Sequence, residues 1–368
     1  MNTAIVIPAV KKNVAFTDDL VKKLGGTSLI QRAIDKARRL VPEEHIYVAT
    51  DSEEICLICK RNNIQYSYKK NLRLKPQNIS ESLGFLFLQL SEQYEELILL
   101  SPYVPLLPEK TLTQALKQFR SFPNRPVLIP VKREVSRVFK KHKRDLHKVL
   151  SGGSEQELLI ESQAFKILSA SLIQNGFNAG KLMPLTYEIN QDLIEIRSYQ
   201  EWWVCEKLLR RKRIVFRIIG DELIGMGHIY RALTLAHEIT DHEVYFVCDE
   251  QSRKAVRRLA GEDYWLGIYK EKDILSRILD LKPDLVINDI LDTQKDYILK
   301  LRKQGIRVVN FEDLGTGANH ANLTINELYD APGKSSGNIL WGQKYFFLRE
   351  EFNEAQPTRF KKKVGAIL

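Results

Sequence analysis

Cysteine is scarce in this chain, with four residues in 368. So few cysteines do not form a disulfide framework, and they favour a reducing compartment. Cys56 and Cys59 lie one helical turn apart, and we predict two buried thiols there, not a redox or metal pair. No stretch approaches the roughly 18 uncharged apolar residues of a membrane span. The N-terminus also lacks a secretory signal, so a cytoplasmic protein without a membrane partner is expected.

An excess of one charge is present but modest. Lys and Arg number 56 against 46 Asp and Glu, which gives a formal net charge of +10. A basic surface suits nucleic acid and nucleotide phosphates equally well. Because no helix-turn-helix, zinc-finger or aromatic RNA-binding pattern is visible, a nucleic-acid partner is not expected. The balance of 44% hydrophobic and 28% charged residues is that of a globular protein.

Short apolar runs alternate with helical patterns along the whole chain, whose length suits two domains of about 150–200 residues each. Strands are expected at 4–8, 45–50, 97–100 and 127–131, and then at 214–219, 244–248, 284–288, 308–311 and 323–325. The rhythm restarts after a basic run at 210–213, so we predict domains at 1–210 and 211–368. Strands separated by helices imply parallel βαβ units, hence an α/β fold.

The first half carries a series of motifs. They are Ile7-Pro8-Ala9 at the end of a strand, Leu29-Ile30 at a helix start, Val48 to Ser52, and Ser101 to Leu106. Together they resemble the CMP-sialic acid synthetase family of cytidylyltransferases, over roughly residues 4 to 209. The resemblance implies a nucleotide-diphospho-sugar-transferase-like sheet and transfer of CMP from CTP to a sialic-acid-like sugar. Homodimers are common in that family.

The loop after the first strand departs from the family pattern. Where the family has Arg followed by Gly-Gly-Ser-Lys, this chain has Val10 followed by Lys11 to Val14. Glycines that admit a phosphate are missing, but lysines could supply cations in their place. The loop is therefore either a variant triphosphate site or a solvated basic loop on a domain that has lost catalysis. The nucleotide-binding residues expected from this comparison are Pro8, Ala9, Lys11, Lys12, Lys22, Lys23 and Asp51.

The expected metal site is also altered. The family closes its domain with Asp-Ile-Asp, whose carboxylates bind magnesium, whereas this chain has Glu195-Ile196-Arg197. Glu195 keeps one carboxylate for Mg²⁺, and Arg197 weakens the site with a positive charge. An arginine there could contact a phosphate in place of a metal, or it could mark a pseudo-enzyme.

A glycine turn with a histidine is the most informative motif of the second half. Gly225-Met226-Gly227-His228 follows a predicted strand and opens a helix, and Arg231 lies in that helix. Gly225, Gly227 and Arg231 form an expected phosphate turn at the helix N-terminus. His228 is placed as a general base or acid near a diphosphate. The alternative is that His228 merely caps its own turn.

This turn resembles the G-x-G-H-x-x-R motif of the pseudaminic-acid-pathway UDP-sugar hydrolase and of spore-coat polysaccharide proteins. Asp284 to Asp289 and Phe311 to Gly315 resemble later motifs of that family, although the His and Tyr that follow its first Asp are missing here. The resemblance covers about residues 213 to 352. It implies a Rossmann-like glycosyltransferase-type domain in which His228 helps water to attack the glycosyl carbon and release UDP.

Asp289 and Asp313 each follow a strand and are expected to line the His228 cleft as catalytic residues. The last residues, 359–368, look like the linker and first strand of a second, UDP-binding half, which is expected to be missing. We therefore predict an enzyme of nonulosonic acid or surface-glycan biosynthesis that joins a cytidylyltransferase-like domain to a nucleotide-sugar hydrolase-like domain. The alternative is a catalytically degenerate protein that binds nucleotide-sugars or acts as a scaffold.

Overall fold

The structure is a computed structural model, and it divides into two compact units, residues 1–210 and 211–368. It describes residues 2–11, 16–74, 79–122, 126–136, 139–142, 145–148, 156–177, 183–189, 193–220, 225–254, 256, 264–332 and 338–346. Among these residues, no helix is both long enough and apolar enough to cross a bilayer.

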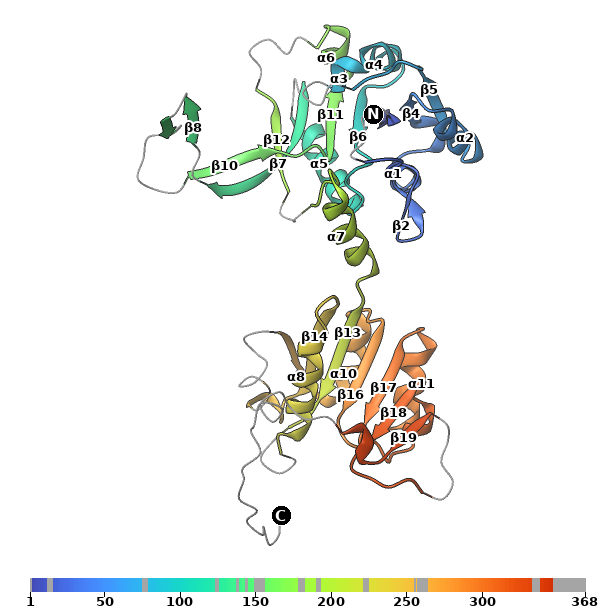
Figure 1. The fold of residues 1–368 in the computed structure, drawn as a ribbon, viewed down its shortest axis with the longest axis vertical. Helices are drawn as coiled ribbons and strands as arrows, with labels where there is room; N and C mark the ends of the chain where they lie inside the picture. Colours follow the sequence, from blue (N-terminus) through green and yellow to red (C-terminus); the bar gives the residue numbers. More distant parts are fainter. Residues whose placement is uncertain are drawn as a thin grey trace. The chain divides into compact units, whose positions relative to one another are not determined.

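An eight-stranded sheet forms the centre of the first unit (Figure 1). Its order is β10-β7-β11-β6-β1-β4-β5, and β12 pairs with β7. The bounds are β1 (Thr3–Ala9), β4 (Ile46–Thr50), β5 (Gln65–Tyr68), β6 (Glu96–Leu100), β7 (Val127–Ser136), β10 (Gln156–Glu161), β11 (Phe165–Ser169) and β12 (Leu185–Glu188). Two small hairpins are β2 (Lys23–Leu24) with β3 (Thr27–Ser28), and β8 (Phe139–His142) with β9 (Asp145–Lys148).

This first sheet is mixed. The strands β6, β1, β4 and β5 are parallel, of which β1, β4 and β6 were predicted, whereas β11 runs antiparallel to both β6 and β7. β10 is likewise antiparallel to β7. The sequence analysis did not predict β5, β10, β11 or β12, whose short runs mix polar with apolar residues.

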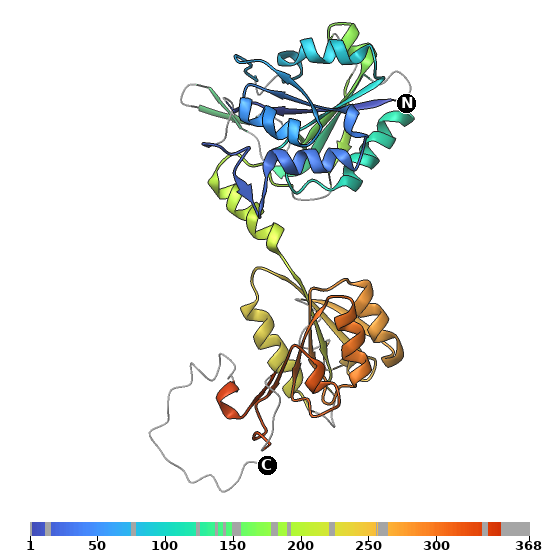
Figure 2. The same ribbon diagram turned by 90° about the vertical axis from the view of Figure 1, so that its right-hand side faces the viewer.

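Helices cover both faces of the first sheet (Figure 2). The helices are α1 (Leu29–Arg38), α2 (Glu53–Arg61), α3 (Ile79–Ser82), α4 (Gly84–Ser91), α5 (Glu109–Ser121), α6 (Ala170–Gln174) and α7 (Tyr199–Arg210), with a 3-10 turn η2 (Glu43–His45). Ser28 caps α1 as its hydroxyl accepts from the Gln31 N–H at 3.3 Å. Cys56 and Cys59 are both buried on α2, as predicted, and burial raises the pKa of Cys59 to about 12.

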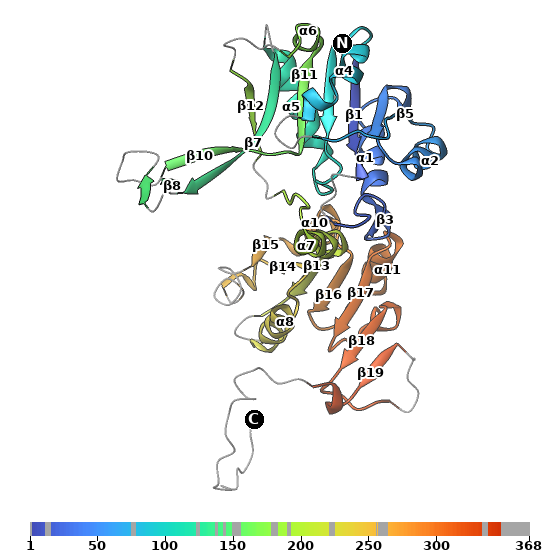
Figure 3. The same ribbon diagram turned by 45° about the horizontal axis from the view of Figure 1, so that its top comes forward.

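The second unit is built on a fully parallel sheet, which confirms the predicted α/β class. Its order is β15-β14-β13-β16-β17-β18-β19, and these labels follow one another across the lower part of Figure 3. The bounds are β13 (Arg213–Ile218), β14 (Glu243–Asp249), β15 (Trp265–Tyr269), β16 (Leu285–Asp289), β17 (Arg307–Phe311), β18 (Leu323–Asn326) and β19 (Ile339–Trp341). The first strand of the unit therefore lies between its second and its fourth, as in doubly wound folds.

Helices pack on both faces of this sheet. Figure 2 shows the yellow α8 (Gly227–Glu238) opposite the orange α10 (Glu271–Asp280) and α11 (Lys295–Lys303). Alternate strand residues separate the two cores: Phe216 packs toward α8, and Val215 packs toward α10 and α11. Short 3-10 turns are η3 (Ala318–His320) and η4 (Gln343–Tyr345).

The strand order of each unit marks one place for a ligand. In doubly wound sheets, ligands bind beyond the carboxyl ends of the strands where successive connections leave toward opposite faces. That point lies between β1 and β6 in the first unit and between β13 and β16 in the second. The segments that follow these four strands therefore contain the candidate site residues.

Candidate functional sites

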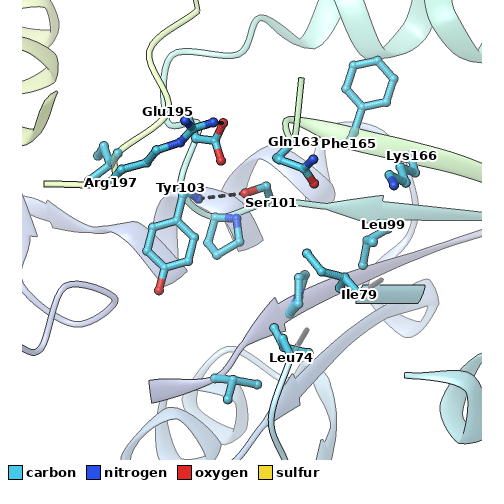
Figure 4. Close-up of a pocket in the computed structure, with 14 residues that line it drawn as sticks. Leu74, Ile79, Leu99, Ser101, Tyr103, Gln163, Phe165, Lys166, Glu195 and Arg197 are labelled. Atoms are coloured by element: carbon cyan, nitrogen blue, oxygen red, sulfur yellow. Dashed lines mark hydrogen bonds and ion pairs between the residues drawn. The ribbon is translucent and has the colours of Figure 1, made fainter. Parts of the chain in front are cut away.

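A cavity of about 320 Å³ lies beyond the ends of β1 and β6 in the first unit (Figure 4). Pro8 lines it from β1 and Val10 from just after that strand, and Ser101 to Tyr103 line it from the segment after β6. Figure 4 shows Glu195 and Arg197 side by side at one edge, with apolar side chains opposite them. These apolar lining residues include Leu74, Ile79, Leu99 and Phe165. The predicted residue Ala9 is buried within β1.

The acidic residue expected to bind Mg²⁺ is already paired. The Glu195 carboxylate accepts from the Arg197 guanidinium at 2.7 Å, and that hydrogen bond raises the pKa of Arg197. No cluster of three or more His, Cys, Asp or Glu side chains suited to a metal occurs in the described parts of the chain. One carboxylate bound to a guanidinium is a poor ligand set for Mg²⁺. A metal at Glu195 stays a prediction, and the residues present here do not favour it.

The cations of the first loop are also engaged by neighbours. Lys11 Nζ lies 2.7 Å from Glu54 and 2.9 Å from Asp18, while its backbone N–H donates to Asp51 at 2.7 Å. The hydrogen bond to Glu54 outweighs partial burial and raises the pKa of Lys11. Lys11 would therefore have to leave two carboxylates before it could bind a triphosphate.

Lys22 and Lys23 do not line the cavity. Lys22 Nζ donates to the Tyr199 hydroxyl at 3.0 Å and lies over the rings of Phe16 and Tyr199. Lys23 is exposed at the start of the small hairpin, and Lys12 lies outside the described residues. A triphosphate site on Lys11, Lys22 and Lys23 is thus not preformed.

Sequence reasoning missed the lining residues that come from the third side of the cavity. Gln163 and Lys166 lie just before and within β11, and Lys166 Nζ pairs with Glu161 at 2.8 Å. Their short run alternates polar and apolar residues too briefly to stand out. Only the antiparallel pairing of β11 with β6 brings them beside Ser101, whose neighbour Leu100 pairs with Phe165.

In the second unit, His228 and Asp289 meet at the expected point. His228 lies in the first turn of α8, after β13, and its Nδ1 is 2.6 Å from Oδ1 of Asp289 at the end of β16. Their side chains are 12% and 2% exposed. When the Asp289 carboxylate is the acceptor of this hydrogen bond, Nδ1 carries the hydrogen and Nε2 is the ring nitrogen with a free lone pair.

Arg231 is part of the same cluster, but in a different role from the expected one. Its Nε and Nη2 donate to the two oxygens of Asp289 at 2.7 and 2.6 Å, and its Nη1 donates to Glu327 at 2.6 Å. Burial alone would lower the pKa of Arg231, but the hydrogen bonds to these carboxylates raise it overall. The Arg231 guanidinium fixes Asp289 and uses most of its N–H donors on two carboxylates, so few donors remain for a phosphate. The assignment of Arg231 to a phosphate turn is therefore not supported.

Two buried glutamates of this cluster were not predicted. Glu312 follows β17 and Glu327 follows β18, and each is at most 5% exposed. Glu312 has φ +50°, a conformation that side-chain-bearing residues rarely adopt. Burial raises the pKa of Glu312. One sequence signal was available: each residue directly follows a predicted strand, Glu312 after β17 and Glu327 after β18, and these strands follow β16 in the sheet order.

Asp313 belongs to a separate set of hydrogen bonds. It is fully buried, and its carboxylate accepts from the Thr293 hydroxyl at 2.6 Å and from the backbone N–H groups of Thr293 and Gly315. Asn310 donates to it as well, at 2.5 Å. These contacts tie the loops after β16 and β17 together. The structure thus unites His228 with Asp289, as expected, but gives Asp313 the contacts of a loop anchor.

The glycines around this turn serve two purposes. Gly225 has φ +87°, and a Cβ added to Gly225 or Gly227 would meet no described atom within 4 Å. Open space there suits a ligand that approaches the turn. Gly220, which the motif does not include, is different: its Cβ would lie 2.4 Å from Cδ1 of the fully buried Ile229.

We expect Gly220→Ala to destabilise the second unit by about 1–3 kcal/mol, because α8 must move or Ile229 must leave its rotamer. Gly227→Ala is the matched control and should leave the melting temperature nearly unchanged. Thermal unfolding followed by circular dichroism measures both. Equal effects of the two substitutions would contradict the close packing of β13 against α8 at Gly220.

Comparisons with known proteins give partial likenesses, and no family model matches the chain. An uncharacterized protein of Methanocaldococcus jannaschii is 27% identical over 148 residues, 36% of this chain and 30% of that protein. The UDP-2,4-diacetamido-2,4,6-trideoxy-beta-L-altropyranose hydrolase of Campylobacter jejuni is 26% identical over 162 residues, 41% of this chain and 57% of that protein. The chain thus matches about a third and just over half of the length of these two relatives.

Solved structures similar to this chain are cytidylyltransferases. A CMP:2-keto-3-deoxy-manno-octonic acid synthetase complexed with CTP has a TM-score of 0.46 and 13% identity, covering 57% of this chain and 99% of its own. A 4-diphosphocytidyl-2C-methyl-D-erythritol synthase from Anaerococcus prevotii has a TM-score of 0.43 over the same share of this chain and 99% of its own, also at 13% identity. The finer resemblance to CMP-sialic acid synthetase stays a prediction.

Proposed function

We propose that this protein is an enzyme of nucleotide-sugar metabolism whose second unit hydrolyses a UDP-sugar at His228. The observation that carries the proposal is the 2.6 Å hydrogen bond between His228 Nδ1 and Asp289 at the β13–β16 switch point. The match to the Campylobacter jejuni hydrolase supports the same reaction class and suggests its named substrate, a diacetamido-trideoxy sugar linked to UDP, as the first to test.

In the proposed reaction, His228 is the general base. Asp289 holds the ring with its hydrogen on Nδ1, so Nε2 accepts a proton from water as the water oxygen attacks the glycosyl carbon. The bond between that carbon and the diphosphate oxygen breaks, UDP leaves, and the sugar gains the hydroxyl. Asp289 also stabilises the imidazolium that forms, and Arg231 holds its carboxylate in place with two hydrogen bonds.

For the first unit, we propose CTP-dependent transfer of CMP to a sialic-acid-like sugar in the cavity beyond β1 and β6. The cavity is of the size that a nucleotide or sugar ligand needs, and it combines apolar walls with a few polar groups. Pyrophosphate release from each of the four nucleoside triphosphates, with and without a nonulosonic acid, tests this proposal. Release with CTP and the sugar acid together is the expected result.

A second candidate for the first unit is nucleotide binding without catalysis. The specific observation in its favour is that Lys11 and Glu195 are both engaged in ion pairs within the unit. In that case CTP would bind and no pyrophosphate would be released, whatever sugar is added. Both proposed functions of the first unit require CTP to bind, and only the first predicts release of pyrophosphate.

If the basic loop holds the triphosphate, the double variant Lys11→Ala with Lys12→Ala should lower CTP affinity by about ten- to a hundredfold. Losing a charge-assisted hydrogen bond costs about 1.5–3 kcal/mol, which corresponds to that range. Isothermal titration of CTP measures the change, with Lys117→Ala, at an exposed lysine of α5, as the control. Unchanged affinity in the double variant would remove the loop from the site.

A further inference from the structure

Three consecutive strand ends in the second unit direct carboxylates at one arginine. Asp289 ends β16, Glu312 follows β17 and Glu327 follows β18, and these strands are neighbours in the sheet. Arg231 is one helical turn beyond His228 on α8, and its side chain is 11% exposed. Of the three carboxylates, Asp289 and Glu327 bind the guanidinium directly, and Glu312 lies 3.8 Å from Nη1.

The contacts form one chain that ends at the histidine. Glu327 accepts from Nη1, Nε and Nη2 donate to Asp289, and Asp289 Oδ1 accepts from His228. With three donors on its two oxygens, Asp289 cannot rotate without breaking a hydrogen bond. The guanidinium is likewise held from both sides, because a rigid planar fork cannot shift at one end alone.

We propose that Glu327 is a positioning residue for His228, which acts through Arg231 and Asp289 to fix the imidazole and its hydrogen on Nδ1. This inference rests on the proposed hydrolysis for its catalytic consequence. Glu327 is nearly fully buried, so its effect on the reaction is transmitted through the cluster.

Glu312 fixes Glu327 in turn. Its Oε1 accepts the backbone N–H of Glu327 at 2.8 Å, and Leu328 donates to the same oxygen at 3.4 Å. Glu312 adopts a strained left-handed conformation, which persists in proteins only where surrounding contacts demand it. This left-handed conformation turns the chain after β17 so that the Glu312 side chain reaches the segment after β18.

The charge of Glu327 also matters to the histidine. Asp289 and Arg231 face His228 directly, and Glu327 and Glu312 face Arg231. With Glu327 present, much of the positive charge of Arg231 is balanced on its far side, and the field of Asp289 at the imidazole is preserved. Without it, protonation of His228 becomes harder, because an excess positive charge disfavours a second cation.

Two substitutions separate the geometry from the charge. Glu327→Gln keeps an oxygen that can accept from Arg231, and Glu327→Ala removes both the oxygen and the charge. For Glu327→Ala we expect kcat to fall by about ten- to a hundredfold, as for misplaced catalytic groups, with KM within about twofold. For Glu327→Gln we expect a smaller loss and a shift of the acid limb of the pH–rate profile to lower pH.

The matched control is Glu271→Gln. Glu271 pairs with Arg217, another largely buried arginine of the same unit, outside the His228 cluster. Its substitution should leave kcat, KM and the pH profile unchanged. If Glu327→Ala and Glu327→Gln behave like this control, the positioning role is wrong.

A second measurement decides the matter without any turnover. The chain has seven histidines, so imidazole 15N NMR on the full-length protein is tractable, and His228→Asn assigns the signal. We expect the Nδ1-protonated tautomer in the parent and in Glu271→Gln, and a mixture of tautomers in Glu327→Ala. A parent that does not hydrolyse UDP-sugars would reject the proposed function, whereas an unchanged tautomer in Glu327→Ala would reject the positioning role.

Discussion

Replacing His228 with Asn is expected to lower UDP-sugar hydrolysis by about a hundred- to ten-thousandfold, the usual effect of removing a general base. Asn can still donate to Asp289 from its amide, so the cluster keeps its hydrogen bond. The side chain is 12% exposed and lies in the first helical turn, where apolar packing is limited. The melting temperature should therefore change little.

His237→Asn is the control for this substitution. His237 is an exposed residue in the last turn of the same helix, α8, and lies near the Tyr264 ring. It should hydrolyse at the parent rate. A His228→Asn variant that retains the parent rate would show that another group activates water, even if the hydrogen bond to Asp289 is present.

Replacing Arg231 with Met is expected to have the largest effect on stability. The substitution removes the guanidinium and leaves Asp289, Glu312 and Glu327 buried near one another. Breaking a buried ion pair on one side costs about 3–5 kcal/mol. For a unit of this size each kcal/mol lowers the melting temperature by about 2–4 °C, so a decrease of about 6–20 °C is expected.

The loss of folding stability in Arg231→Met should depend on pH, and its direction follows from Glu312. Burial already raises the pKa of Glu312 in the folded parent above its value in the unfolded chain. Protonated Glu312 therefore contributes its full stabilisation when the pH is below the unfolded-state pKa. This contribution is lost as the pH rises through the folded-state pKa. In Arg231→Met the stability lost on raising the pH is greater than in the parent, because the guanidinium no longer faces Glu312. The difference in stability between variant and parent should therefore become smaller as the pH falls. Differential scanning calorimetry across that range measures it.

Arg277→Met provides the control for Arg231→Met. Arg277 is an exposed residue that pairs with Asp280 on the surface of α10, and such pairs contribute little to stability. A loss of stability at Arg231 no greater than at Arg277 would mean that the three carboxylates are neutral or hydrated without the arginine.

The sequence predicted those parts of the fold that leave a local pattern. The helix start at Leu29 and five of the seven strands described in the second sheet were predicted, whereas β15 and β19 were not. The antiparallel β11 was not predicted, because its run of five residues mixes polar and apolar side chains and its pairing with β6 departs from the βαβ pattern. Lys166, which lies in β11, was therefore not predicted to line the cavity.

The same limit explains the outcome at the two candidate sites. The convergence of His228 and Asp289 follows from strand order, which a βαβ pattern and a glycine turn can predict. The engagement of Arg231 by Glu327 and of Lys11 by Glu54 depends on which side chains face one another across elements. No periodicity encodes that, so Arg231 and Lys11 were expected to meet phosphates and were found with carboxylates.

The measurement that tests the central claim most directly is hydrolysis of the UDP-linked diacetamido-trideoxy sugar in H₂¹⁸O, with the parent and His228→Asn compared by mass spectrometry. If water attacks the glycosyl carbon, the parent releases unlabelled UDP and a sugar that carries one ¹⁸O, and the variant releases neither at a comparable rate. Label in the released UDP, or no UDP released by the parent, would contradict the assignment of this reaction to the His228–Asp289 site.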